Sequence, residues 1–250
     1  RQIGEEISDL LDYEPGRFLR RRTIRRKWVK IADQEAPPIL APLPPRLIDG
    51  GMVAPGLLAH IITSKYVDHL PLYRQEDIYR GRHGVELPRQ TLCRWVEEAA
   101  RCCQPVYRLM KQQMFTQGYV KVDETPIKYL SPGSGKAQQG YFWTYHGTNG
   151  DTIFDWQPGR GHQCLEDVVP EDYKGVLQCD GYSAYPTFAK KHEGIILAGC
   201  WAHARRKFHD ALEHFPKEAG WILRQLQLLY EVERQLRQSR AGPEQRLEVR

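Results

Sequence analysis

Residues 52–115 place apolar and polar side chains at the three- and four-residue spacing of amphipathic helices. The segment PGLLAHIITSKYVDHL carries Pro55 where a helix is expected to begin. The next residues predict a helix, a short turn at residues 81–87, and a second helix entered at Pro88. This is the outline of a helix-turn-helix, although any two packed helices share it. As a DNA reader, the second helix would present Arg89, Gln90, Thr91 and Arg94.

From residue 119 the pattern changes to short runs of strand character. Three such runs come first: YVKVDETPI, YFWTYHG and DTIFDW. The rest alternates helix and strand: HQCLEDVV, GVLQCD, AYPTFAKKH, GIILAGCW and AHARRKFHDALEHF. The order βββαβαβα predicts an antiparallel meander followed by parallel strands with crossover helices. Such a mixed α/β sheet matches the ribonuclease-H-like fold, which we expect residues 119–215 to form in part.

Two further segments flank these regions. Residues 36–50 contain five prolines between Pro37 and Pro45 and predict a stiff, extended linker. Residues 216–250 include the amphipathic pattern WILRQLQLLYEVERQLRQ, which predicts a helical insertion or extension. Because the sequence starts with arginine rather than methionine, we expect a fragment of a longer protein.

Positive charge is concentrated near the start. Residues 1–35 predict a hairpin, since two β-like runs flank a Pro-Gly turn. Residues 17–30 hold eight basic side chains and no acidic one, which indicates either a solvated surface or a phosphate-binding strip with Phe18 and Trp28 as apolar neighbours. The lack of interspersed acids favours the strip. Its candidate DNA contacts are Arg20, Arg21, Arg22, Arg25, Arg26, Lys27 and Lys30.

Composition excludes several classes of protein. The 250 residues are 41% hydrophobic and 27% charged, with a net charge of +5, which is typical of a globular protein. No run of about 18 apolar residues and no signal-peptide pattern occurs, so we expect no membrane span. The six cysteines have no disulfide-framework spacing. They predict reduced thiols, mostly packed as small hydrophobic side chains, in a cytoplasmic protein.

Two of the predicted buried strands carry an aspartate near their inner end, Asp123 and Asp180. A buried carboxylate is usually paired, hydrogen-bonded or bound to a metal. In a ribonuclease-H-like sheet the first and fourth strands are neighbours, and a divalent cation would remove the repulsion between the two acids. Two Mg²⁺ or Mn²⁺ ions about 4 Å apart would then activate a water or 3′-hydroxyl and stabilise the leaving oxygen of a phosphodiester. Each aspartate alone is better explained by a turn; together they favour metal chemistry.

Other polar and aromatic residues near this site suggest lesser roles. Glu124 should point to the opposite face from Asp123, because side chains alternate along a strand, so at best it would support the site from behind. His203 would either line a phosphate-facing helix or cap that helix. The basic residues expected beside it on a phosphate-facing helix are Arg205, Arg206 and Lys207. The aromatic run YFWTY from Tyr141 is expected in the core and on the sheet surface, not as a base-stacking platform.

The motifs VDETPI, LQCDGYSAY, CWAHARRKF and SKYVDHLPLYRQE resemble transposases of the insertion sequence 66 family of bacteria. The likeness covers nearly the whole chain. It implies a DDE-type transposase, a polynucleotidyl transferase that binds catalytic Mg²⁺ through Asp123 and Asp180. Such an enzyme nicks DNA at the element's ends and joins the 3′-hydroxyls to target DNA. The resemblance also implies double-stranded DNA as partner, homo-oligomers and a bacterial cytoplasmic location.

The chain departs from this family in two respects. The family usually has a cysteine-rich zinc module near its N-terminus, but no cysteine precedes Cys93, so residues 1–35 would be a remnant of that DNA-binding module. The family's third acid, a glutamate in an Asn-Asn-x-x-Glu-like motif, is expected beyond residue 250. Two alternatives therefore remain: a ribonuclease-H-like nuclease without strand transfer, and a non-catalytic module that binds transposon ends.

Overall fold

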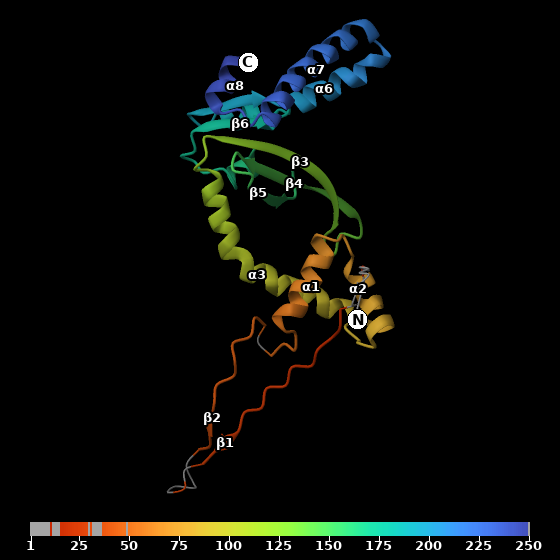
Figure 1. Ribbon diagram of the computed structural model, residues 1–250, viewed down its shortest axis with the longest axis vertical. Coiled ribbons are helices and arrows are strands. Elements are labelled where there is room, and N and C mark those ends of the chain that lie inside the picture. The colour runs from red at the N-terminus through yellow and green to blue at the C-terminus, as the bar shows by residue number, and fades with distance from the viewer. Residues whose placement is uncertain (1–10, 12–15, 30, 32–36, 49, 250) are drawn as a thin grey trace, which may run out of the picture. The chain divides into compact units, whose positions relative to one another are not determined.

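The computed structural model describes residues 11, 16–29, 31, 37–48 and 50–249, and the chain forms two compact units. The first unit is Arg1–Gln104 and the second is Pro105–Arg250. The ribbon in Figure 1 labels their helices and strands. Among the described residues, no helix combines the length and the apolar character needed to cross a lipid bilayer.

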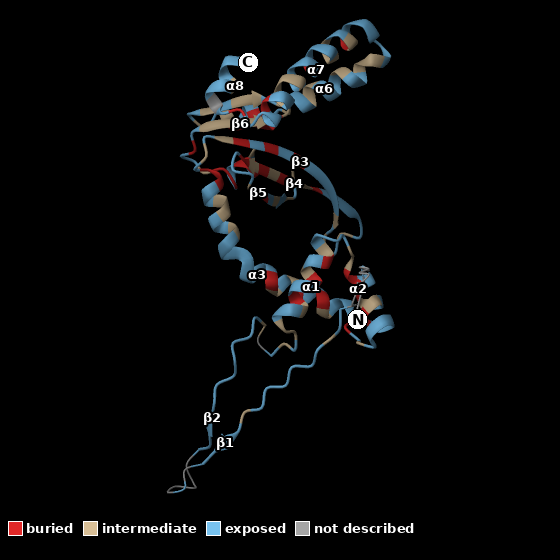
Figure 2. Ribbon diagram, viewed as in Figure 1, coloured by how far each residue is buried: buried red, intermediate tan, exposed pale blue. Residues whose placement is uncertain are grey.

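The described core of the first unit is helical. It contains α1 (Pro55–Tyr66), α2 (Leu72–His83) and the first part of α3 (Arg89–Met114). Apolar residues at helical spacing on all three helices pack into one cluster, visible as the red segments of Figure 2. Its buried members include Leu58, Ile61, Leu72, Tyr79, Leu92, Trp95 and Ala99. The prediction of helices between residues 52 and 115 is confirmed.

The turn between α2 and α3 begins later than predicted. The helix continues through Gly81 to His83, and Gly84 ends it with a left-handed backbone (φ 63°). The Gly84 N–H donates to the Arg80 carbonyl and the Val85 N–H to the Tyr79 carbonyl, both at 3.1 Å. This is a Schellman-type helix end, which glycine adopts without steric cost. The second glycine in the GRHG segment therefore sets the boundary.

The N-terminal strand pairing also differs from the expected hairpin. The described ladder joins β1 (Lys27–Trp28) to β2 (Ile39–Leu40) in antiparallel register. The second strand thus comes from the proline-rich segment predicted to be a linker. The Pro-Gly turn proposed at residues 15–16 lies partly outside the described residues, since residue 15 is not among them. Prolines are compatible with this pairing, because a two-stranded ladder has only edge strands.

The second unit is built on a five-stranded mixed sheet. Its strands are β3 (Tyr119–Leu130), β4 (Ala137–Gly147), β5 (Thr152–Gln157), β6 (Gly175–Cys179) and β7 (Ile195–Gly199). Their spatial order is β5-β4-β3-β6-β7. The first three pair antiparallel, while β6 pairs parallel with both β3 and β7. The predicted mixed α/β sheet is confirmed, and the first and fourth of its strands are neighbours.

One face of this sheet is packed. Short helices α4 (Gln163–Glu166) and α5 (Ala184–Ala189) and the end of α3 supply side chains to a core that includes Trp143, Tyr145 and Leu177. On the other face Phe142, Phe154 and Trp156 remain accessible to solvent, with exposed fractions of 38%, 60% and 42%. The aromatic run from Tyr141 therefore divides between core and sheet surface, as predicted.

The remaining elements follow β7. They are α6 (Trp201–Asp210), a 3₁₀ turn (Ala211–Glu213), α7 (Pro216–Gln238) and α8 (Pro243–Val249). Figure 1 shows α6 and α7 side by side as a helical hairpin. The long amphipathic pattern predicted the helix α7, and that prediction is confirmed.

The cysteines correct one prediction. All six are free thiols, but only Cys164 and Cys179 are buried. Cys93, Cys102 and Cys103 lie exposed on α3. The expectation that most cysteines pack as small hydrophobic side chains is wrong, because three of them lie at solvent-exposed positions of α3.

Candidate active site

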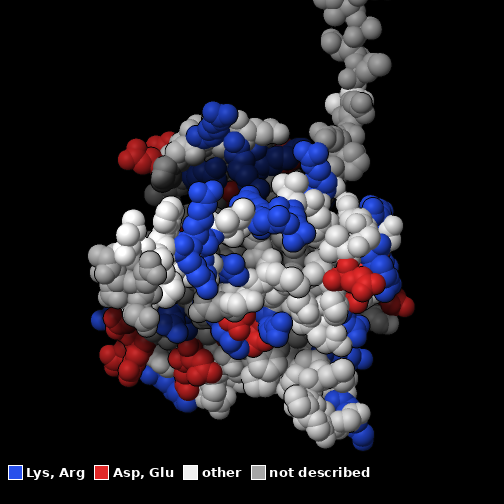
Figure 3. Space-filling view, turned by 90° about the horizontal axis from the view of Figure 1, so that it is seen from below, with Lys and Arg blue, Asp and Glu red and all other residues white. Residues whose placement is uncertain are grey.

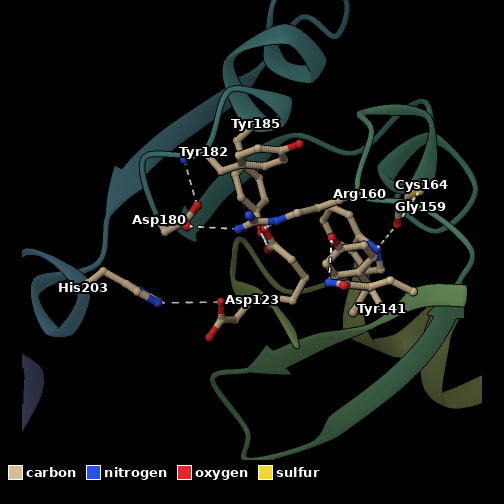
Figure 4. Close-up of polar contacts among 12 residues, drawn as sticks. Asp123, Tyr141, Gly159, Arg160, Cys164, Asp180, Tyr182, Tyr185 and His203 are labelled. Atoms are coloured by element: carbon tan, nitrogen blue, oxygen red, sulfur yellow. Dashed lines mark hydrogen bonds and ion pairs between the residues drawn. The ribbon is translucent and has the colours of Figure 1, made fainter. Parts of the chain in front are cut away.

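The pairing of β3 with β6 determines where the two aspartates lie. The parallel register matches Val120 with Leu177 and Lys121 with Gln178. Asp123 lies two residues further along β3, and Asp180 lies two residues after Gln178, just past the end of β6. Paired strands lie about 4.8 Å apart, and residues two apart share a face. Continued past Gln178, this register would set the two carboxylates at adjoining positions. Figure 4 shows Asp180 beside Arg160 and Asp123 beside His203.

The two carboxylates differ in exposure. The Asp123 side chain is 57% exposed, whereas that of Asp180 is 21% exposed. Asp180 follows the last residue of β6, and its Oδ1 accepts a hydrogen bond of 2.8 Å from the Tyr182 N–H. This local bond fixes the carboxylate at the strand end, as aspartates do in turns.

Glu124 points to the opposite, packed face of β3, as alternation predicts. Its side chain is 0% exposed. Oε1 accepts from Arg160 Nε at 2.5 Å, and Oε2 accepts from the Tyr185 hydroxyl. Burial, followed by the hydrogen bond to Glu124, raises the pKa of Tyr185, so this hydroxyl stays a donor.

Arg160 is a residue that the sequence analysis missed. It lies in the loop between β5 and α4, and its side chain is 34% exposed. Besides the bond to Glu124, its Nη2 lies 3.5 Å from Asp180 Oδ2, and the guanidinium stacks 3.9 Å from the centre of the Tyr182 ring (Figure 4). Burial lowers the pKa of Arg160, but Glu124 and then Asp180 outweigh that effect and raise it. In the sequence, Arg160 stands out only by the glycine on each side of it, and these glycines do not indicate which residues it contacts.

His203 approaches the site from α6. Its Nε2 lies 3.7 Å from Asp123 Oδ1, while Nδ1 is buried without a hydrogen-bond partner among the described residues. Cys200, not His203, occupies the N-cap position of α6. Capping, one of the two roles considered for His203, is therefore wrong, because the side chain is directed toward Asp123 instead.

The basic residues of α6 lie on its surface. Arg205, Arg206 and Lys207 are all exposed or partly exposed. The first two, with His209 and Tyr230, line a shallow hollow of about 540 Å³ between α6 and α7. A phosphate can reach guanidinium groups placed in this way.

The carboxylates of Asp123 and Asp180 offer oxygen ligands to a metal ion. No cluster of three or more His, Cys, Asp or Glu side chains with metal-binding geometry occurs in the part of the chain that the structure describes. Two carboxylates from neighbouring strands nevertheless suit Mg²⁺. This ion prefers oxygen ligands and often takes only one or two carboxylates, keeping several waters. The residues present therefore fit a magnesium ion.

The candidate DNA contacts of the first unit are mostly solvent-exposed. Most basic residues of the strip extend into solvent, although Arg25 donates to the Ala41 carbonyl at 2.9 Å. Lys30 lies outside the described residues. Phe18 packs edge-on against Tyr79 at 5.2 Å, whereas Trp28 is exposed. Figure 3 shows Lys and Arg side chains gathered into groups on one face, with smaller acidic groups.

The second helix of the predicted helix-turn-helix presents Arg89 and Arg94 to solvent, while Leu92 and Trp95 face the core. The basic and apolar sides of α3 are therefore separated within the first unit. This arrangement is compatible with DNA reading, and equally with ordinary helix packing.

Comparisons with known proteins identify the family. A family model described as "Transposase IS66 family" matches residues 50–250. Two similar proteins come from Sinorhizobium fredii, and both are named only as uncharacterized proteins. The protein y4qI is 38% identical over 222 residues, which cover 83% of this chain and 40% of the relative. The protein y4jD is 35% identical over 250 residues, which cover 94% and 48%. The chain spans less than half the length of these relatives, and it belongs to the IS66 family of transposases.

Proposed function

We propose that this chain carries the metal-binding core of a DDE-type transposase, built on a ribonuclease-H-like sheet. The observation that supports the proposal most is the parallel pairing of β3 with β6, since Asp123 lies on β3 and Asp180 directly follows β6. The order of the five strands and their mixed directions agree with such a sheet. The reaction proposed for the whole protein is metal-dependent nicking at transposon ends, followed by strand transfer from the 3′-hydroxyls.

Asp123 and Asp180 would hold Mg²⁺ or Mn²⁺. When bound, the ion supplies a Lewis acid that activates the attacking oxygen and stabilises the leaving oxygen of a phosphodiester. The chain's own residues orient the ligands: the Tyr182 N–H donates to one oxygen of Asp180, and the Glu124 N–H donates to Asp123 Oδ1 at 3.0 Å. The third acid of the family is expected in the part of the protein beyond residue 250.

DNA binding is proposed for three basic regions. They are the strip at residues 17–30, the exposed side of α3 with Arg89 and Arg94, and the α6 surface with Arg205, Arg206 and Lys207. Positive side chains gain affinity for DNA by releasing counterions from phosphates, so binding should weaken steeply as salt rises. The partner would be double-stranded DNA at transposon ends and target sites, bound by a homo-oligomer in the bacterial cytoplasm.

Metal binding and DNA nicking together test this proposal. Titration of Mn²⁺ into the 250-residue chain should reveal binding that Asp123→Asn and Asp180→Asn each weaken by at least about 100-fold. Removal of a residue that only hydrogen-bonds to a metal ligand lowers metal affinity by about 10–100-fold, so loss of a ligand itself should cost at least as much. The exposed Asp172→Asn serves as the matched control and should leave binding unchanged. Nicking of supercoiled DNA by the full-length protein, if it requires the metal and disappears in Asp123→Ala, would support transposase chemistry over DNA binding alone.

Two outcomes would contradict the proposal. A chain that binds DNA but no Mn²⁺ would be a non-catalytic module. Nicking without any joining of 3′-hydroxyls, when the full-length protein is supplied with transposon ends, would instead indicate a nuclease.

A further inference from the structure

We propose that Glu124 is a positioning residue that holds Arg160 away from Asp180 and thereby leaves the Asp180 carboxylate available to a divalent cation. This inference rests on the metal-binding function proposed above. Its basis is one guanidinium shared unequally by two carboxylates. Arg160 Nε is 2.5 Å from Glu124 Oε1, whereas Nη2 is 3.5 Å from Asp180 Oδ2.

Burial explains why Glu124 holds the guanidinium more closely. The Glu124 side chain is 0% exposed, and a carboxylate in that position is costly unless it is paired and hydrogen-bonded. Arg160 supplies the opposite charge, and the Tyr185 hydroxyl satisfies the second oxygen. Asp180 retains contact with water, so its attraction to the same cation is more strongly screened.

The Tyr182 ring supports the same placement. It lies 3.9 Å from the Arg160 guanidinium carbon, and its own backbone N–H holds Asp180 Oδ1. The quadrupole of an aromatic ring favours a guanidinium stacked on it. Stacking on Tyr182 therefore holds the Arg160 guanidinium near Asp180 without a close ion pair. Figure 4 shows Arg160 extending past the Tyr182 ring toward Asp180.

The unequal sharing has a consequence for metal binding. A guanidinium that formed a close pair with Asp180 would occupy the carboxylate oxygens and repel a divalent cation. With Glu124 in place, Asp180 Oδ2 meets the guanidinium only at the outer limit of a hydrogen bond. Glu124, which follows Asp123 in the sequence, therefore affects Asp180 indirectly, because it holds Arg160.

A set of four proteins tests this inference: the unmodified chain, Glu124→Gln, Arg160→Gln and the double variant. Glu124→Gln keeps the shape but removes the charge that holds Arg160, so Mn²⁺ affinity should fall about tenfold or more. In the double variant the competing guanidinium is also gone, and Mn²⁺ affinity should return to within about threefold of the unmodified chain. Glu166→Gln, which loses a carboxylate paired with Lys191 instead, is the matched control and should not change Mn²⁺ binding.

A metal-free measurement separates this inference from the proposed function. A double-mutant cycle between Arg160→Gln and Asp180→Asn, read from the unfolding equilibrium, should show weak coupling in the unmodified chain. In the Glu124→Gln background the coupling should rise about tenfold in the equilibrium constant, because Arg160 then pairs with Asp180.

The inference would be overturned by equal coupling in the two backgrounds. It would also be overturned if the double variant bound Mn²⁺ as weakly as Glu124→Gln alone, since a purely structural defect predicts that result. Absence of Mn²⁺ binding in the unmodified chain would contradict the proposed metal site itself, while the coupling measurement would still decide whether Glu124 holds Arg160.

Discussion

The carboxylate site of the second unit and the basic strip of the first unit both carry charge, but the chain positions that charge differently. Asp180, Glu124 and Arg160 are fixed by strand register, backbone bonds and burial. In the strip, the described basic residues are mostly exposed, and Arg25 makes one bond to a backbone carbonyl. At the carboxylate site the charged groups have fixed positions, so we expect a single substitution there to have a large effect on binding or stability. In the solvated strip, we expect the total positive charge, rather than any single residue, to determine the affinity for DNA.

The largest expected effect falls on the two aspartates. Asp123→Asn combined with Asp180→Asn should abolish measurable Mn²⁺ binding and leave the fold intact, because Asp123 is largely exposed and asparagine can still accept the Tyr182 N–H. Calorimetric titration measures the first effect and circular dichroism the second. Retained Mn²⁺ affinity in the double variant would place the metal elsewhere.

Arg160→Gln should have the next largest effect, on stability rather than on metal binding. It leaves the buried Glu124 carboxylate without its cation. Breaking a buried pair costs about 3–5 kcal/mol, and the partial exposure of Arg160 reduces this to about 2 kcal/mol. Chemical denaturation measures the change. Arg101→Gln, which removes an exposed helical ion pair, is the control and should cost less than about 1 kcal/mol.

An alkaline titration tests burial beside the site. Burial, and then the charge of Asp180, raises the pKa of Cys179 to about 12 from its ordinary value of 9.0. The folded chain therefore favours the neutral thiol. The resulting stability is fully present below pH 9 and is lost as pH rises toward 12, at up to about 1.4 kcal/mol per pH unit.

Replacing Cys179 by alanine should flatten the fall in stability across this window, as measured by denaturation at a series of pH values. The exposed Cys103→Ala should leave the slope unchanged. Equal slopes for the unmodified chain and Cys179→Ala would show that the end of β6 is more hydrated than its burial indicates.

The smallest single effects are expected in the strip. Replacing Arg20, Arg21 or Arg22 singly by glutamine should weaken DNA binding only a few-fold and lower the salt slope by about 1 for each phosphate that is no longer neutralised. When the three substitutions are combined, their effects on DNA affinity and on the salt slope should add. Fluorescence anisotropy at several salt concentrations measures both quantities, with the Lys190→Gln variant of the second unit as control. A single substitution that abolished binding would indicate a specific interaction instead of a summed charge.

The features of the carboxylate site that depend on strand order and alternation could be predicted from the sequence. The strand order and the neighbouring positions of β3 and β6 follow from apolar periodicity and topology, so the placement of Asp123 and Asp180 on or directly after adjoining strands was predictable. The opposite orientation of Glu124 follows from alternation along β3.

The features that the sequence did not reveal depend on tertiary context. The partners of Arg160 come from two segments far from it in the sequence, β3 and the turn after β6, and no local pattern encodes them. The α2 end was misplaced because two glycines, Gly81 and Gly84, offer the same signal, and only one adopts the left-handed backbone. The ladder between β1 and β2 was missed because prolines surround Ile39 and Leu40 and suppress the strand pattern.

The most direct test of the central claim is anomalous diffraction from crystals of the chain grown with Mn²⁺. A manganese peak is expected within about 2.2 Å of carboxylate oxygens from both Asp123 and Asp180, on the face of the sheet away from Glu124. A peak bound by neither aspartate, or aspartates directed to different faces of the sheet, would contradict it.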